Sequence, residues 1–61
     1  MANLTTKELA GLSDQLEFEK VLCCKYRAAE QECTDGELKT CFRKYGDQHK
    51  QNYDCLLTYL N

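Results

Sequence analysis

The two residues best suited to chemistry in this sequence are Glu19 and His49. Glu19 falls on the apolar stripe of a helical pattern, so its carboxylate is predicted to face a core, where an unpaired charge is costly. His49 is the only histidine and falls on the inward stripe of a second helical pattern. If the two helices fold back on each other about Asp35, Glu19 and His49 come to the same height. In a two-fold dimer, two copies of each would form a ligand set that iron, manganese or zinc accepts.

A second interpretation of the same pair is structural. A buried Glu19–His49 pair satisfies itself as a hydrogen-bonded ion pair and fixes the register of the two helices. In this interpretation tyrosine hydroxyls close the network, and three tyrosines fall within about two helical turns of the pair: Tyr26, Tyr45 and Tyr53. A different register of the helices, which would leave the pair in solvent, is the third alternative.

No motif supports an enzyme built on these residues. The sequence has no glycine-rich phosphate loop, no nucleophile elbow and no pair of acids at a defined catalytic spacing. Glu30 lies on the same stripe as Glu19 but nearer the end of the helix, where it is expected to reach solvent or to pair with Lys39 across the hairpin. Catalysis through a metal or through the cysteines therefore ranks third among the functions considered.

Five cysteines are a large share of 61 residues. An odd number and the lack of an export signal argue against a disulfide framework. Cys23 and Cys24 are adjacent in a helical pattern, where a bond between them would be strained. No C-x-x-C pair occurs, and one histidine is too few for a zinc finger. We expect reduced, mostly buried thiols. The alternative is a redox or disulfide role, for which Cys33 and Cys41 beside the turn are the best candidates.

The pattern of apolar residues predicts two helices. Thr5 and Glu8 form a capping box, which places the start of the first helix near residue 6 and its end near residue 33. Its inward stripe recurs at steps of three and four over about four heptads: Leu9, Leu12, Leu16, Glu19, Cys23, Tyr26, Glu30 and Cys33.

A break at Thr34-Asp35-Gly36 separates this helix from a second one over about residues 36–60. Thr34 or Asp35 is a good N-cap, and Glu37 in the first turn suits the helix dipole. The inward stripe of the second helix is widened on both sides: Leu38, Phe42, Tyr45, His49, Asn52, Leu56 and Tyr59, with Cys41, Tyr53, Leu57 and Leu60. A turn this short makes the helices antiparallel neighbours, so residues 1–61 are predicted to form one all-α helical-hairpin domain.

The first helix carries a second apolar stripe, roughly 130° around it from the first: Phe18, Val21, Leu22, Ala28 and Ala29. A helix with two apolar faces needs more than one neighbour. The simplest solution is a homodimer of hairpins that forms a four-helix bundle, with these five residues in the interface. The alternative is a monomer with an exposed patch.

Composition narrows the partners and the location. The formal net charge is −2, with acids and bases mixed along the chain, whereas a nucleic-acid binder would show a basic face. No apolar run approaches the roughly 20 residues of a membrane span. The N-terminus lacks the basic and apolar regions of a signal peptide. We therefore expect neither nucleic acid nor membrane as a partner, and a location in the cytoplasm.

The order and spacing of many residues resemble those of the short spore-coat-like proteins of clostridia, which are similar to the spore coat protein F family. The resemblance covers nearly the whole chain and is carried by these positions: Leu4-Thr5-Thr6-Lys7-Glu8-Leu9, Asp14-Gln15-Leu16, Glu19-Lys20-Val21-Leu22, Lys25-Tyr26, Cys33, Asp35, Leu38-Lys39, Cys41, His49, Tyr53, Leu56-Leu57 and Leu60. It implies a ferritin-like four-helix fold and association with the spore coat and its other proteins.

Ferritin-like relatives often bind two irons through a glutamate on one helix and a Glu-x-x-His on the next. By this resemblance Glu19 and His49 match the first and last of those ligands. Gly46 and Asn52 stand where an acid and a second histidine are expected, which removes two ligands. We therefore expect a structural or assembly protein, in the spore coat or the cytoplasm. The alternative is a metal-binding protein that uses Glu19 and His49 from both chains.

Overall fold

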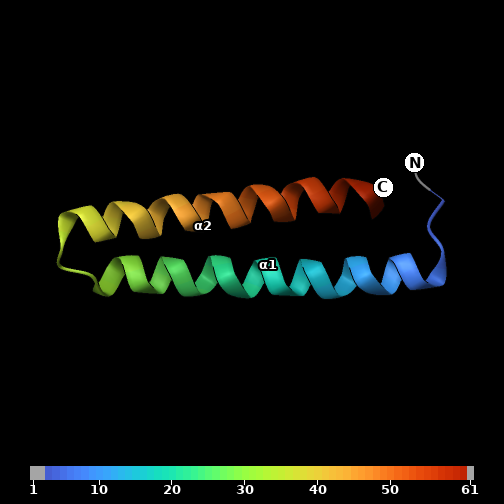
Figure 1. Ribbon diagram of the computed structural model, residues 1–61, viewed down its shortest axis with the longest axis horizontal. Coiled ribbons are helices and arrows are strands. Elements are labelled where there is room, and N and C mark those ends of the chain that lie inside the picture. The colour runs from blue at the N-terminus through green and yellow to red at the C-terminus, as the bar shows by residue number, and fades with distance from the viewer. Residues whose placement is uncertain (1–2, 61) are drawn as a thin grey trace.

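The computed structural model describes residues 3–60 as an antiparallel helical hairpin (Figure 1). Helix α1 spans Thr6–Glu32, helix α2 spans Gly36–Leu57, and a short 3-10 helix, η1, spans Thr58–Leu60. The described chain contains no strand. The second helix was expected to stay α-helical to about residue 60, but its last turn tightens to 3-10 geometry. Residues 1, 2 and 61 of the predicted domain lie outside the described range.

The caps that the sequence predicts set the helix starts. The Thr5 hydroxyl accepts a hydrogen bond from the Glu8 N–H at 3.1 Å, and the Glu8 carboxylate accepts one from the Thr5 N–H at 3.0 Å. At the second start it is Asp35, not Thr34, that acts as N-cap, and its carboxylate accepts from the Leu38 N–H at 2.8 Å. Each side chain satisfies an N–H that has no partner inside the helix. The capping box is therefore confirmed.

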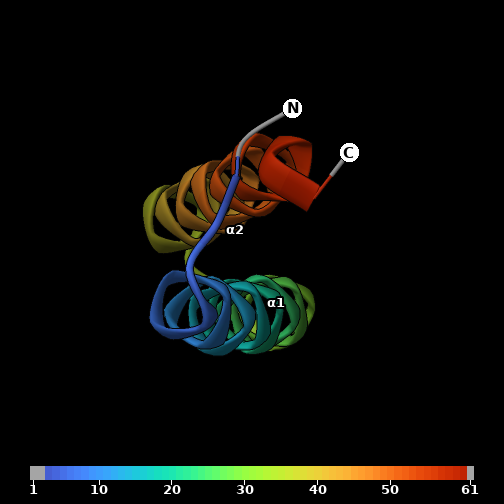
Figure 2. The same cartoon turned by 90° about the vertical axis from the view of Figure 1, so that its right-hand side faces the viewer.

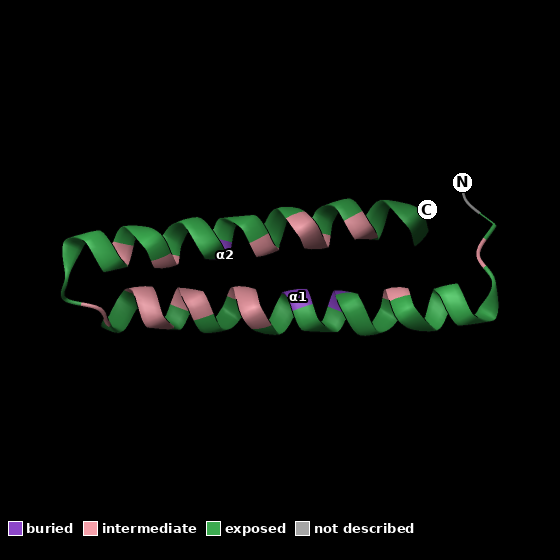
Figure 3. Cartoon of the chain, viewed as in Figure 1, coloured by how far each residue is buried: buried purple, intermediate pink, exposed green. Residues whose placement is uncertain are grey.

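The two helices lie side by side along most of their length, with the first turns of α1 extending beyond the end of η1, and they form a rod of 45 × 16 × 12 Å (Figures 1 and 2). Only the facing sides exclude water, as the colouring by burial shows (Figure 3). Most residues of the predicted inward stripes are at least half-buried there. The remaining members are exposed, because a single neighbouring helix covers too little of them: Leu9, Leu38, Cys41, Tyr45, Leu57, Tyr59 and Leu60.

Aromatic rings fill the seam between the middle of the hairpin and its turn. The Tyr26 ring of α1 lies 6.0 Å from the Phe42 ring and 5.5 Å from the Tyr45 ring, both from α2, measured between centroids. On its other side, Tyr26 stacks on His49 at 5.6 Å with the ring planes 2° apart. These contacts join the apolar part of the seam to the polar layer around His49.

Gly46 is the one buried residue of α2 in the described chain, and its role is to leave room. The Arg27 guanidinium of α1 lies over it, and a Cβ added at position 46 would come within 2.9 Å of Arg27 Nη1. From there Arg27 donates hydrogen bonds to the Arg43 carbonyl at 3.4 Å and to the Asp47 carboxylate at 2.7 Å. The absence of a side chain at Gly46 therefore lets Arg27 of α1 reach across α2 to Arg43 and Asp47.

Among residues 3–60, neither helix combines the length and the apolar character that crossing a lipid bilayer requires.

The Asp35 cap yields a test of the hairpin. Replacing Asp35 by alanine removes the acceptor of the Leu38 N–H, so the free energy of unfolding should fall by about 1 kcal/mol. Replacing it by asparagine keeps an N-cap acceptor and should change the stability by only a few tenths of a kcal/mol. Urea unfolding followed by circular dichroism measures both variants. Equal stability of the alanine and asparagine variants would contradict the capping role.

Candidate functional site

The candidate site lies at mid-length of the hairpin, where Glu19 of α1 meets His49 of α2. The Glu19 Oε2 atom and the His49 Nδ1 atom are 2.6 Å apart. Glu19 is only 5 % exposed and is the one buried charged residue among those described. The expectation that a hairpin turning at Asp35 brings these two side chains together is therefore confirmed.

Two amides complete the hydrogen bonding of the carboxylate. Gln15 donates to Glu19 Oε1 at 3.0 Å from one turn earlier on α1, and Asn52 donates to Oε2 at 3.2 Å from α2. Because an ionised carboxylate only accepts, His49 Nδ1 carries the hydrogen of the third bond. We call the four residues Gln15, Glu19, His49 and Asn52 the carboxylate cluster.

The prediction that tyrosine hydroxyls close this network is wrong, since the cluster contains none of the tyrosines. Tyr26 contributes its ring instead, stacked on the imidazole of His49. Sequence reasoning missed Gln15 as a donor because it lies beside the inward stripe, not on it. Its spacing of four residues from Glu19 was the available signal, since side chains four apart on a helix are neighbours.

The cluster keeps the carboxylate ionised. The hydrogen bond from His49 lowers the pKa of Glu19 most, burial opposes this by raising it, and the bonds from Asn52 and Gln15 lower it further. The net pKa lies below the usual value of 4.5. In the described chain, no buried side-chain nitrogen or oxygen lacks a hydrogen-bond partner. The charge is therefore satisfied within one hairpin.

Within a single chain, the carboxylate cluster is poorly suited to bind a metal ion. Both oxygens of Glu19 already accept hydrogen bonds, and His49 presents its Nδ1 to the carboxylate. Within residues 3–60, no group of three or more His, Cys, Asp or Glu side chains lies close enough to hold a metal. In metalloproteins a carboxylate in this position orients a histidine whose other ring nitrogen binds the metal. The additional ligands would have to come from outside this hairpin.

A shallow hollow of about 280 Å³ opens beside the cluster on one broad face of the rod. It is lined by residues of both helices: Gln15, Glu19, Asn52, Cys55 and Leu56. Besides the Glu19 carboxylate and the Cys55 thiol, the lining consists of two amides and one aliphatic side chain, so Glu19 is the only carboxylate in it.

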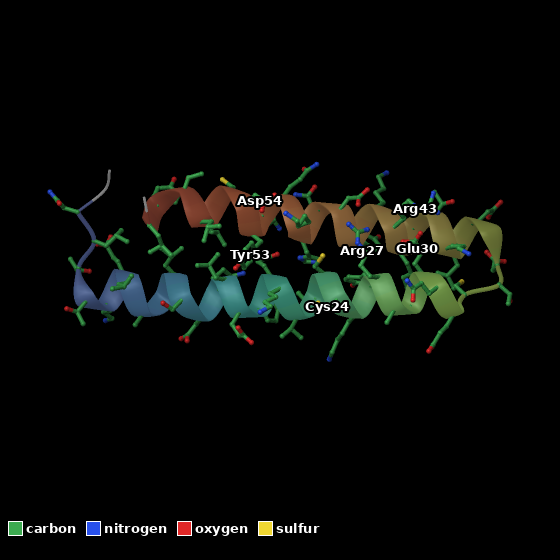
Figure 4. The ribbon with its side chains drawn as sticks, turned by 180° about the vertical axis from the view of Figure 1, so that it is seen from behind. Cys24, Arg27, Glu30, Arg43, Tyr53 and Asp54 are labelled. Carbon is green, nitrogen blue, oxygen red and sulfur yellow. The ribbon has the colours of Figure 1, made fainter. Side chains whose placement is uncertain are left out.

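The opposite broad face carries ion pairs (Figure 4). Arg27 pairs with Asp47 at 2.7 Å, and Arg43 pairs with Glu30 at 2.8 Å, so both pairs join α1 to α2. Glu30 was expected to reach solvent or to pair with Lys39, and its partner is instead Arg43, one turn further along α2 than Lys39. On the same side, a hollow of about 220 Å³ is lined by two cysteines, two lysine stems and a ring: Lys20, Cys23, Cys24, Lys50 and Tyr53.

The five cysteines are all free thiols, and none is buried. Cys23 and Cys33 are half-buried on the seam, and the other three are exposed. The expectation of mostly buried thiols is therefore wrong for the single hairpin, because two helices cover only one side of each other. Cys33 and Cys41, the candidates for a redox pair, are not bonded to each other.

The residues predicted to form a dimer interface lie on the sides of α1 that α2 leaves open. Phe18 is 57 % exposed and Val21 is 40 % exposed. Ala28 is exposed as well, whereas Leu22 and Ala29 are half-buried at the edge of the seam. The hairpin therefore covers only part of the second apolar stripe and leaves Phe18, Val21 and Ala28 open.

Comparison of the chain with protein-family models, with characterised proteins and with solved structures gives no match. The resemblance to spore-coat proteins therefore stays a prediction from the sequence.

The lowered pKa of Glu19 predicts a pH-dependent stability. A carboxyl group with a lower pKa in the folded state stabilises the fold fully above about pH 4.5, and this contribution is lost as the pH falls through the folded pKa. Replacing Glu19 by glutamine should lower the free energy of unfolding at pH 7 by about 1–3 kcal/mol. It should also remove part of the decline below pH 4.5. Urea unfolding at several values between pH 3 and pH 7 measures both effects.

The matched control is Glu17→Gln, which neutralises an exposed acid on the same helix. Its stability should follow that of the natural protein within about 0.5 kcal/mol at every pH. If Glu19→Gln also followed the natural protein, the carboxylate cluster would not stabilise the fold.

Proposed function

We propose that this protein is a small structural or assembly component that works as a homodimeric helical bundle. The observation that carries the proposal is the thin core of the single hairpin. Leu16 is the only buried hydrophobic residue among those described, while eight large hydrophobic side chains are exposed. A soluble chain that leaves so much apolar surface open is typical of one that packs against a partner.

The overall dimensions support the same proposal. The chain has an accessible surface of 4821 Å², whereas a globular monomer of this mass exposes about 4,100 Å². Its radius of gyration is 14.2 Å, compared with about 10.5 Å for a compact domain of this length. A rod of two helices has too little interior for its apolar residues, and packing against a second copy would cover more of them.

The carboxylate cluster suits a structural role. A fully bonded buried charge contributes little net stability, but it destabilises every register that leaves the charge unpaired. Glu19 accepts hydrogen bonds from Asn52 and His49 of α2 and from Gln15 of its own helix. The cluster therefore serves to align the two helices, as a small component with one fixed shape requires.

We place this component in the spore coat because of the sequence resemblance alone. A fluorescently tagged copy expressed in a sporulating host should form a ring around the mature spore. Diffuse fluorescence in the mother cell would argue against the coat and leave the structural role in place.

The contact between Glu19 and His49 favours a second candidate, a metal-binding protein that uses this pair from both chains. Metal analysis of protein purified without a histidine tag separates the two functions. The structural proposal expects far less than one metal ion per chain and no rise in melting temperature with Fe(II), Mn(II) or Zn(II). A stoichiometric metal that is lost in Glu19→Gln and in His49→Gln would favour the metal-binding protein.

The structural proposal predicts self-association. At micromolar concentration the protein should sediment at twice its chain mass of 7.1 kDa. Phe18→Glu should sediment as a monomer, because it places a charge in the expected interface. The control Gln51→Glu adds the same acid at an exposed position of α2 and should stay dimeric. If the natural protein sedimented as a monodisperse monomer, the proposal would be wrong.

A further inference from the structure

A second seam runs along α1 on the side turned away from α2. Its positions recur at steps of three and four residues, like those of the inward stripe, over about 38 Å of helix. We call them the outer stripe, and every member is exposed: Lys7, Gly11, Asp14, Phe18, Val21, Lys25, Ala28 and Glu32. The stripe has apolar residues at its centre and charged residues towards both ends.

The charges of the outer stripe have no partners within the hairpin. The ion pairs of the described chain involve other residues throughout, and the outer stripe contributes to none of them. Basic and acidic residues also alternate along the stripe, in the order Lys7, Asp14, Lys25 and Glu32. When a second copy of the stripe runs in the opposite direction, each basic residue therefore meets an acidic one.

We propose that a second copy of the chain packs its α1 antiparallel along this stripe, with the two-fold axis passing between residues 19 and 20. This rests on the proposed homodimer and specifies which helix meets which, and in what register. Because the outer stripe faces away from α2, the four helices then lie in the order α2, α1, α1, α2, with the two α1 helices at the centre. Positions at equal distances from the axis on the two helices then face each other, and symmetry makes each contact occur twice. The contacts are Phe18 with Val21 of the second copy, Asp14 with Lys25, Lys7 with Glu32, and Gly11 with Ala28.

Other registers of the same two stripes bring like charges together. A slip of one heptad in one direction places Lys7 opposite Lys25 of the second copy. A slip in the other direction places Asp14 opposite Glu32 and Val21 opposite Lys25. A parallel arrangement sets every charge against its own copy. Opposite charges that face each other across a contact favour one partner and one orientation, and like charges disfavour the others. The charges of the outer stripe therefore favour the antiparallel register centred between residues 19 and 20 over these alternatives.

Lys25 is the best position for a test. The residues three and four positions away from it on the helix are all uncharged: Val21, Leu22, Ala28 and Ala29. Reversing the charge of Lys25 therefore disturbs no ion pair within the helix. Asp14 lies eleven residues from Lys25, about 16 Å along the axis of α1. Any coupling between Asp14 and Lys25 must therefore pass between two chains.

The experiment is a charge swap measured by sedimentation equilibrium. Lys25→Glu should raise the dimer Kd by about tenfold, because two symmetric attractions become repulsions. Asp14→Lys should do the same. The double variant D14K/K25E restores opposite charges and should bring the Kd back to within about threefold of the natural value. The control K44E reverses an exposed lysine of α2 and should change the Kd by less than twofold.

The outcomes separate this proposal from the one on which it rests. If the natural protein dimerises but the two single changes add up in the double variant, the antiparallel register is wrong and the homodimer stands. The same holds if neither single change alters the Kd. A natural protein that stays monomeric at all concentrations tested overturns the homodimer itself.

Discussion

The buried carboxylate of Glu19 is the constraint on which the rest of the hairpin depends. A buried charge is tolerated only when hydrogen-bond donors satisfy it. Asn52 and His49 of α2 donate to Glu19 at 3.2 and 2.6 Å, and Gln15 of α1 donates at 3.0 Å. Sliding α2 by one turn would break both bonds from α2. The stack of Tyr26 on His49 and the crossing of Arg27 over Gly46 are aligned in the same register. An alternative pairing of the helices would lose all of these contacts together.

The fold and the central contact could be predicted because they depend on local rules. The capping residues Thr5 and Asp35 mark helix starts, and a short turn fixes which positions share a height. The details depend on neighbours that no local rule supplies. Amides and not tyrosine hydroxyls bond Glu19, and the Tyr26 ring stacks on His49 instead. Burial of the cysteines was overestimated, since periodicity shows which face a thiol occupies and not how many helices cover that face.

The inward stripe of α1 specifies how the two helices of one chain pair, and the outer stripe is proposed to specify how two chains pair. On the inward stripe, a buried polar group makes wrong registers costly through lost hydrogen bonds, and this acts within one chain. In the proposed dimer, the exposed charges of the outer stripe would make wrong registers repel each other, and this would act between chains. A buried network is little affected by salt, whereas exposed pairs are screened. The hairpin should therefore keep its shape under ionic conditions that alter the proposed association.

The geometry of association also bears on the metal-binding alternative. In the proposed dimer the two α1 helices lie back to back, so each Glu19 points away from the symmetry axis towards its own α2. With helix axes 8–10 Å apart, the two carboxylates are separated by roughly 20 Å. One metal centre cannot span that distance. A site that shares Glu19 and His49 from both chains needs the inward faces to converge, which would require opening the Glu19–His49 contact. The antiparallel pairing along the outer stripe and a shared ferritin-like metal centre therefore exclude each other.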